Sequence, residues 1–103
     1  MLEIDDGGVL TFLICIPGAR RVDVVGVFSG WHEQRFPMER VNDECWRLSL
    51  RPGPGEHQFR YLVNEEIWLL DATSHGTRTN AEGIEVCRVW MPPAQITPDS
   101  IAA

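Results

Sequence analysis

Hydrophobic and polar residues alternate along much of the chain with a period of two, and this pattern predicts β-strands. The clearest alternation covers residues 57–63, with His57, Phe59, Tyr61 and Val63 on one face and Gln58, Arg60 and Leu62 on the other. We expect this strand to be central. Further strands are predicted over residues 9–16, 20–27, 46–50, 66–70 and 84–91, with an edge-like piece over 36–41. No stretch of the sequence shows helical periodicity.

Turn residues separate these strands. Pro17-Gly18 and Pro52-Gly53-Pro54-Gly55 each end a strand, and Asn64-Glu65 is placed for a tight hairpin. Residues 71–83 lack periodicity and are expected to form one long loop. We therefore predict an all-β, immunoglobulin-like antiparallel β-sandwich of about seven strands over residues 9–91. Residues 1–8 are expected to be an N-terminal extension, and residues 92–103 a flexible tail.

The parity of the strands separates core positions from surface positions. Val22 and Val24 are expected to point inward, while Arg21 and Asp23 face water. Trp46 alternates with Leu48 and Leu50, which predicts a core position. Trp31 follows a β-branched run and a Gly/Ser turn, where side chains usually lie on the surface.

Charge and cysteine content narrow the function classes. The chain has 103 residues and a formal net charge of −6, which disfavours binding to nucleic acid or to anionic membranes. The acidic N-terminus does not look like a secretory signal, and the apolar run over residues 9–16 is too short to span a bilayer. Three cysteines without Cys-x-x-Cys spacing suggest a reduced compartment. We therefore expect a cytoplasmic protein.

Four motifs follow one another in a fixed order. They are Val-Val-Gly-x-Phe-x-Gly-Trp at 24–31, Met-x-Arg at 38–40, Trp-x-Leu-x-Leu-x-Pro-Gly-x-Gly-Glu-His-x-Phe-Arg-Tyr-Leu-Val-Asn at 46–64, and Trp-Leu-x-Asp at 68–71. Together they resemble the family-48 carbohydrate-binding modules. This family includes the glycogen-binding domain of the AMP-activated protein kinase β subunit and the early-set domains that precede isoamylase and branching-enzyme barrels. The resemblance covers residues 11–89.

The resemblance implies an α-1,4-glucan site made of two tryptophans, a basic residue and a loop asparagine. Trp31 and Trp68 match the tryptophans, and Arg60 matches the basic residue on the neighbouring strand. The family usually has an asparagine directly before the last strand, where this chain has Ile84-Glu85, so Asn80 is the nearby candidate. The implied partners are a glucan and, beside it, a glycogen-metabolising enzyme or a kinase subunit.

Each of these residues also permits a purely structural role. Trp31 could fold back over the sandwich, Trp68 could belong to the core because both faces of its strand are apolar, and Arg60 could be an ordinary surface charge. Trp90 is structural or unexplained. His32, His57 and His75 lack metal-ligand spacing, and the carboxylate pairs Asp5-Asp6 and Glu65-Glu66 are adjacent in sequence rather than positioned for glycoside hydrolysis.

The leading hypothesis is therefore a non-catalytic glucan-binding module with no metal site and no cofactor. The second is an early-set domain that has lost sugar binding and contacts another protein, suggested by the outward apolar residues Val25, Leu62 and Leu69. A small enzyme is the third. The oligomeric state is left open by the sequence.

Overall fold

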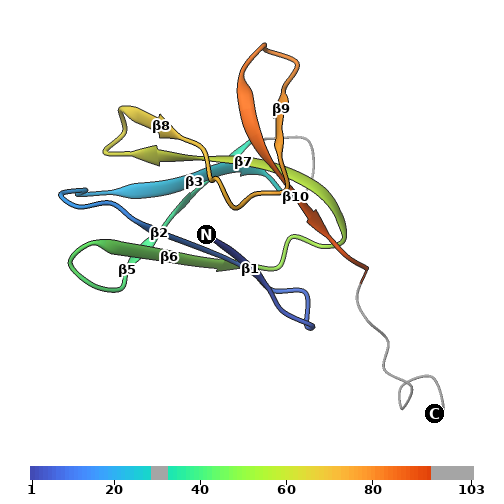
Figure 1. Ribbon diagram of the computed structural model, residues 1–103, viewed down its shortest axis with the longest axis horizontal. Helices are drawn as coiled ribbons and strands as arrows, with labels where there is room; N and C mark the ends of the chain where they lie inside the picture. The colour runs from blue at the N-terminus through green and yellow to red at the C-terminus, as the bar shows by residue number, and fades with distance from the viewer. Residues whose placement is uncertain (29–32, 94–103) are drawn as a thin grey trace.

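The computed structural model describes residues 1–28 and 33–93, and the described chain forms two antiparallel β-sheets that pack face to face (Figure 1). The four-stranded sheet has the order β1 (Leu2–Ile4), β2 (Leu10–Cys15), β6 (Cys45–Leu50), β5 (Glu39–Arg40). The other sheet has the order β4 (Gln34–Pro37), β3 (Val22–Val27), β7 (Gly55–Val63), β10 (Glu85–Met91), β9 (Thr77–Thr79), and β8 (Ile67–Leu69) also pairs with β7. The predicted antiparallel sandwich is confirmed.

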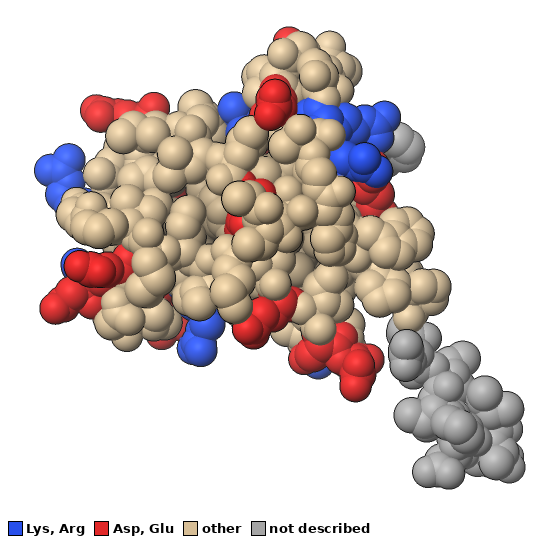
Figure 2. Space-filling view, in the orientation of Figure 1, with Lys and Arg blue, Asp and Glu red and all other residues tan. Residues whose placement is uncertain are grey.

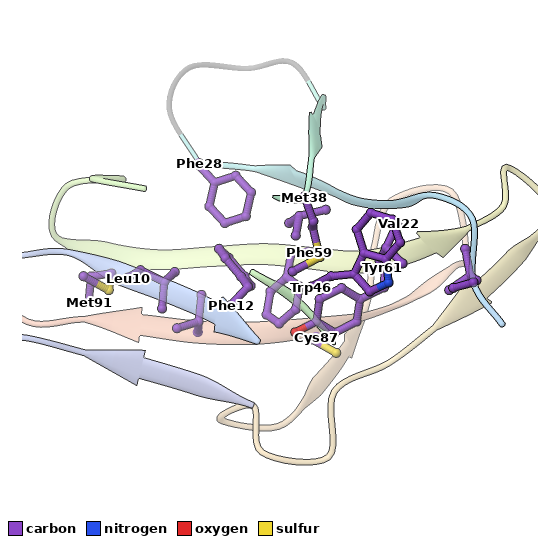
Figure 3. Packing of buried hydrophobic residues seen from close by; sticks show 14 residues of the cluster. Leu10, Phe12, Val22, Phe28, Met38, Trp46, Phe59, Tyr61, Cys87 and Met91 are labelled. Atoms are coloured by element: carbon purple, nitrogen blue, oxygen red, sulfur yellow. The ribbon is translucent and has the colours of Figure 1, made fainter. Parts of the chain in front are cut away.

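The central strand β7 has the alternation that the sequence predicts. His57, Phe59, Tyr61 and Val63 are all buried between the sheets. Phe12 from β2 meets this strand edge to face, with ring centroids 4.9 Å from Phe59 and 6.4 Å from Tyr61 (Figure 3). Such perpendicular aromatic pairs are the favoured geometry. Trp46 is also in this core, as predicted.

The hairpin between β7 and β8 is confirmed as well. Asn64 and Glu65 have φ angles of 52° and 62°, so both central residues adopt the left-handed conformation of a type I′ turn. The Asn64 side-chain oxygen accepts hydrogen bonds from the backbone N–H groups of Arg20 and Arg21, at 2.7 and 3.1 Å. The turn is thereby tied to the start of β3.

The piece predicted over residues 36–41 is divided between the two sheets. Pro37 is the last residue of β4, opposite Asp23 of β3, whereas Glu39 already pairs with Arg47 of β6. Met38 lies between them, is buried, and donates its backbone N–H to the carbonyl of Val22 at 2.9 Å. The chain therefore crosses from one sheet to the other at Met38.

Asp23 is not exposed to water as predicted. It is on the outer face of β3, as its parity requires, but its side chain is fully buried. The Nε atom of Arg21 lies 3.1 Å from its carboxylate and Nη1 of Arg35 lies 3.9 Å away, and both arginine side chains are about half exposed. The prediction of exposure was wrong because two long side chains shield the carboxylate while keeping their own charged ends in water.

Two segments predicted to lie outside the strands contain strands. Leu2 pairs with Phe12, so the expected N-terminal extension, residues 1–8, contributes an edge strand to the smaller sheet. Within the expected loop over residues 71–83, Arg78 pairs with Val86 across β9 and β10. Strands this short carry too few alternating positions for periodicity to reveal them. Among the described residues there is no helix that could cross a membrane.

The cysteines also differ from the prediction. Cys15 and Cys45 lie opposite each other where β2 pairs with β6, and they form a disulfide. Cys87 is buried and free, and its burial raises the pKa of the thiol. The spacing of Cys15 and Cys45 in the sequence gave no sign of this pair, because strand pairing brings together residues that lie far apart in sequence. A cytoplasmic location thereby loses the support of the cysteine pattern, since disulfides persist in oxidising compartments.

Candidate functional site

The outer face of the six-stranded sheet brings two of the predicted site residues together. Arg60 is on the outward parity of β7, opposite Val25 of β3. Trp68 is directly opposite Leu62, the next outward residue of β7. Arg60 and Trp68 are therefore diagonal neighbours on one face, a spacing that long and aromatic side chains can bridge.

The Arg60 guanidinium stacks on the Trp68 ring. The guanidinium carbon lies 3.6 Å from the ring centroid, well within cation–π range. Trp68 is 43% exposed, so it is not a core residue. Its neighbour Leu69 instead packs against the core. We call the pair Arg60 and Trp68 the platform.

An apolar floor supports the platform. Val25 and Leu62 face outward but are only 6% and 3% exposed. The buried Nε atom of Arg60 has no hydrogen-bond partner within the described part of the chain. Its position therefore depends on stacking against Trp68 and on the packing beneath it, which makes the platform a pre-formed surface.

A shallow hollow of about 310 Å³ lies beside the platform. Val25, Val27 and Gln58 line it from the outer face of the sheet, and Glu33 also borders it. The turn that precedes β10 contributes Asn80, Ala81 and Glu82. Since Val25 lines the hollow and is opposite Arg60, the hollow lies next to the platform. The outward parity of Gln58 is visible in the sequence, but Glu33 and Glu82 carried no signal that would have marked them as site residues.

Asn80 shapes this border of the hollow. Its side-chain oxygen accepts hydrogen bonds from the backbone N–H groups of Glu82 and Ile84, at 2.9 and 3.0 Å. Its own backbone N–H donates to the carbonyl of Ile84 at 2.8 Å. Asn80 thus holds the turn closed, an asparagine side chain being well suited to bonding nearby backbone groups.

Trp31 lies outside the described residues, so its position relative to the platform is not defined. The nearest described residues on either side of it are Phe28, which is buried in the core, and Glu33, which borders the hollow. Three of the four predicted residues, Arg60, Trp68 and Asn80, therefore lie on or beside the outer face of the six-stranded sheet.

An antiparallel sandwich with an exposed, arginine-stacked tryptophan beside a shallow hollow has the architecture of a carbohydrate-binding module. The sequence profile of carbohydrate-binding module 48, described as the isoamylase N-terminal domain, matches residues 3–78. The chain belongs to this family.

Its curated relatives are much longer enzymes. The chain is 42% identical over 57 residues to the 1,4-alpha-glucan branching enzyme GlgB 2 of Rhizobium etli, an overlap covering 53% of the chain and 8% of that enzyme. It is 32% identical over 75 residues to the branching enzyme GlgB of Rhodopseudomonas palustris, covering 72% of the chain and 10% of that enzyme. The chain therefore spans about a tenth of the length of these relatives.

Solved structures of pullulanases share the fold. The pullulanase of Anoxybacillus sp. LM18-11 complexed with maltotetraose matches 85% of this chain and 13% of its own, with a TM-score of 0.66 and 17% identity. The apo pullulanase of Paenibacillus barengoltzii matches 84% of this chain and 14% of its own, with a TM-score of 0.56 and 18% identity. At such identities the likeness concerns the fold alone.

Proposed function

We propose that this module binds α-1,4-glucan without acting on it chemically. The observation that carries the proposal is the platform, in which an exposed Trp68 ring is stacked against Arg60 beside the hollow. Membership of a carbohydrate-binding family and the glucan-active relatives support it.

The chemistry of the platform matches that of the sugar. Glucose rings present apolar C–H faces and polar hydroxyl edges, so a flat aromatic ring beside a planar hydrogen-bond donor complements both. The exposed part of Trp68 stacks on a sugar face, and Arg60 donates to hydroxyl groups. At about 25 cal/mol per Å², covering one sugar face contributes roughly 1–2 kcal/mol. Short oligosaccharides then bind in roughly the high micromolar to millimolar range.

The remaining predicted residues complete the proposed site. Trp31 supplies a second stacking surface, and Asn80 positions the turn that borders the hollow. The multiple weak contacts of such a site favour long glucans, because binding of one segment raises the effective concentration of the next.

Replacing Trp68 with alanine is expected to weaken binding of maltoheptaose by about 5- to 30-fold, the equivalent of the roughly 1–2 kcal/mol lost with the stacking surface. Isothermal titration calorimetry measures the change. Ile67→Ala is the matched control, because Ile67 is the preceding residue of β8 and is 52% exposed, but pairs with Val63 on the opposite parity. Equal affinities for the native chain and Trp68→Ala would refute the proposed site, and a native chain that binds no glucan would refute the function.

A protein-contacting module is the alternative, favoured by exposed apolar residues near β8. Ile67 and Leu70 are 52% and 41% exposed. The residues that suggested this function from the sequence do not support it, since Val25 and Leu62 are buried and Leu69 packs inward. Retention on glycogen resin distinguishes the two functions. A chain that passes through the resin but co-purifies with a glycogen-metabolising enzyme or kinase subunit would favour the alternative.

A further inference from the structure

Trp90 is a second exposed tryptophan, at the other end of the same sheet. At 54% it is the most exposed large hydrophobic side chain of the described residues. Its backbone is nevertheless held on both sides, because it pairs with Glu56 of β7 and donates its N–H to Nδ1 of His75 at 2.8 Å. A bulky apolar ring is thus presented to solvent from a fixed backbone, which lowers the entropy lost on binding.

Trp90 and Trp68 belong to the same face of the sheet. Trp68 is opposite Leu62 and Trp90 is opposite Glu56, and both partners are on the outward parity of β7. Six residues of an extended strand separate these two positions, or about 20 Å. Arg60 and Gln58 are the outward residues of β7 between them, so Arg60 and the hollow that Gln58 lines occupy the intervening surface.

Polar groups suited to hydroxyls accompany Trp90. Glu56 accepts a hydrogen bond from Nε of Arg88 at 2.7 Å and another from Nη1 of Arg78 at 3.0 Å. The hydrogen bond from Arg88 lowers the pKa of Glu56, which keeps the carboxylate charged. Figure 2 shows basic and acidic side chains gathered beside the β9–β10 hairpin. Together they offer planar donors and a carboxylate acceptor next to an aromatic face.

We propose that Trp90, with Glu56 and Arg88, forms a second α-glucan subsite, and that one linear glucan chain lies along β7 from Trp68 across the hollow to Trp90. This inference rests on the proposed function and extends it from one sugar-binding site to two subsites that contact the same glucan. Once a glucan is bound at Trp68, its binding at Trp90 is intramolecular. The second subsite therefore strengthens binding only for glucans long enough to reach it.

Two ligands with the same number of glucose units distinguish the contributions of the two subsites. β-Cyclodextrin is a compact ring that can cover one tryptophan, whereas linear maltoheptaose can extend from one subsite toward the other. Trp90→Ala is expected to weaken maltoheptaose binding by about 5-fold or more and to weaken β-cyclodextrin binding much less, because the ring cannot contact both tryptophans at once. Trp68→Ala is expected to weaken both. Calorimetry on the full chain, with circular dichroism to verify folding, measures these changes.

Trp90→Phe serves as the conservative variant and should retain part of the maltoheptaose affinity, because an aromatic face remains. Unchanged maltoheptaose binding in Trp90→Ala, with Trp68→Ala still impaired, would overturn the second subsite while leaving the proposed function intact. An equal loss of affinity for β-cyclodextrin and for maltoheptaose in Trp90→Ala would also overturn it, since the effect would not depend on the length of the ligand. A native chain that binds neither ligand would overturn both proposals.

Discussion

Replacing Gly26 with alanine is expected to lower the free energy of unfolding by about 3 kcal/mol or more. A Cβ atom at this position of β3 would lie 2.3 Å from the backbone oxygen of Gln58 and 2.8 Å from both Phe28 and Phe59. The first contact is with the backbone of the central strand, which cannot move without breaking the β3–β7 ladder. The cost therefore comes from strand separation or from displaced core rings. Glycine within a strand often marks such a close approach.

Urea unfolding followed by tryptophan fluorescence measures this loss. Gly7→Ala is the matched control, because its φ is not in the left-handed region and its nearest contact for an added Cβ is the Asp5 side chain at 3.4 Å. Its stability should change by less than about 0.5 kcal/mol. A Gly26→Ala protein as stable as the native chain would show that strands β3 and β7 can separate locally at little cost.

Replacing Asp71 with alanine is expected to cost about 2–4 kcal/mol, because it leaves the buried Tyr61 hydroxyl and several partly buried donors without an acceptor. One carboxylate oxygen accepts from the Tyr61 hydroxyl at 2.6 Å and from the Met1 ammonium at 2.7 Å. The other accepts from the backbone N–H and the hydroxyl of Thr73, at 2.8 and 2.6 Å. Burial and the bond to Asp71 also raise the pKa of Tyr61, which therefore stays protonated as a donor.

The same carboxylate makes stability depend on acid pH. Burial raises the pKa of Asp71, but the hydrogen bonds from the N-terminus, Thr73 and Tyr61 outweigh it and lower the pKa from 3.8 to about 2. Because the folded pKa lies below the unfolded value, this contribution is fully present above about pH 4 and is lost as the pH falls toward 2. It amounts to about 2 kcal/mol.

Thermal melts between pH 2 and pH 6 measure this dependence. Asp71→Asn keeps the size of the side chain but cannot ionise, so its melting temperature should fall less steeply across the acid window than that of the native chain. Asp6→Asn, at an exposed position near the β1–β2 turn, should leave the profile unchanged. Identical acid profiles for the native chain and Asp71→Asn would show that Asp71 does not control acid stability.

The alternation of hydrophobic and polar residues predicted much of the fold, because it indicates which side of each strand is buried. The alternation over residues 57–63 identified the central strand, and Asn64-Glu65 identified the hairpin through its turn chemistry. Parity also placed Arg60 on the outward face. Parity does not report what covers an outward residue, and for this reason Asp23 and Leu62 were expected at the surface but are buried.

Periodicity and motif order were enough to define the class of this protein: a β-sandwich resembling a carbohydrate-binding family, with Trp68 and Arg60 as candidate ligand contacts. The folded chain was needed to reveal that the guanidinium of Arg60 stacks on Trp68, that Cys15 meets Cys45, and that Trp90 shares a sheet face with Trp68. The difference arises from register. Periodicity depends on each strand alone, whereas the neighbours of a side chain depend on which residues two strands place opposite each other.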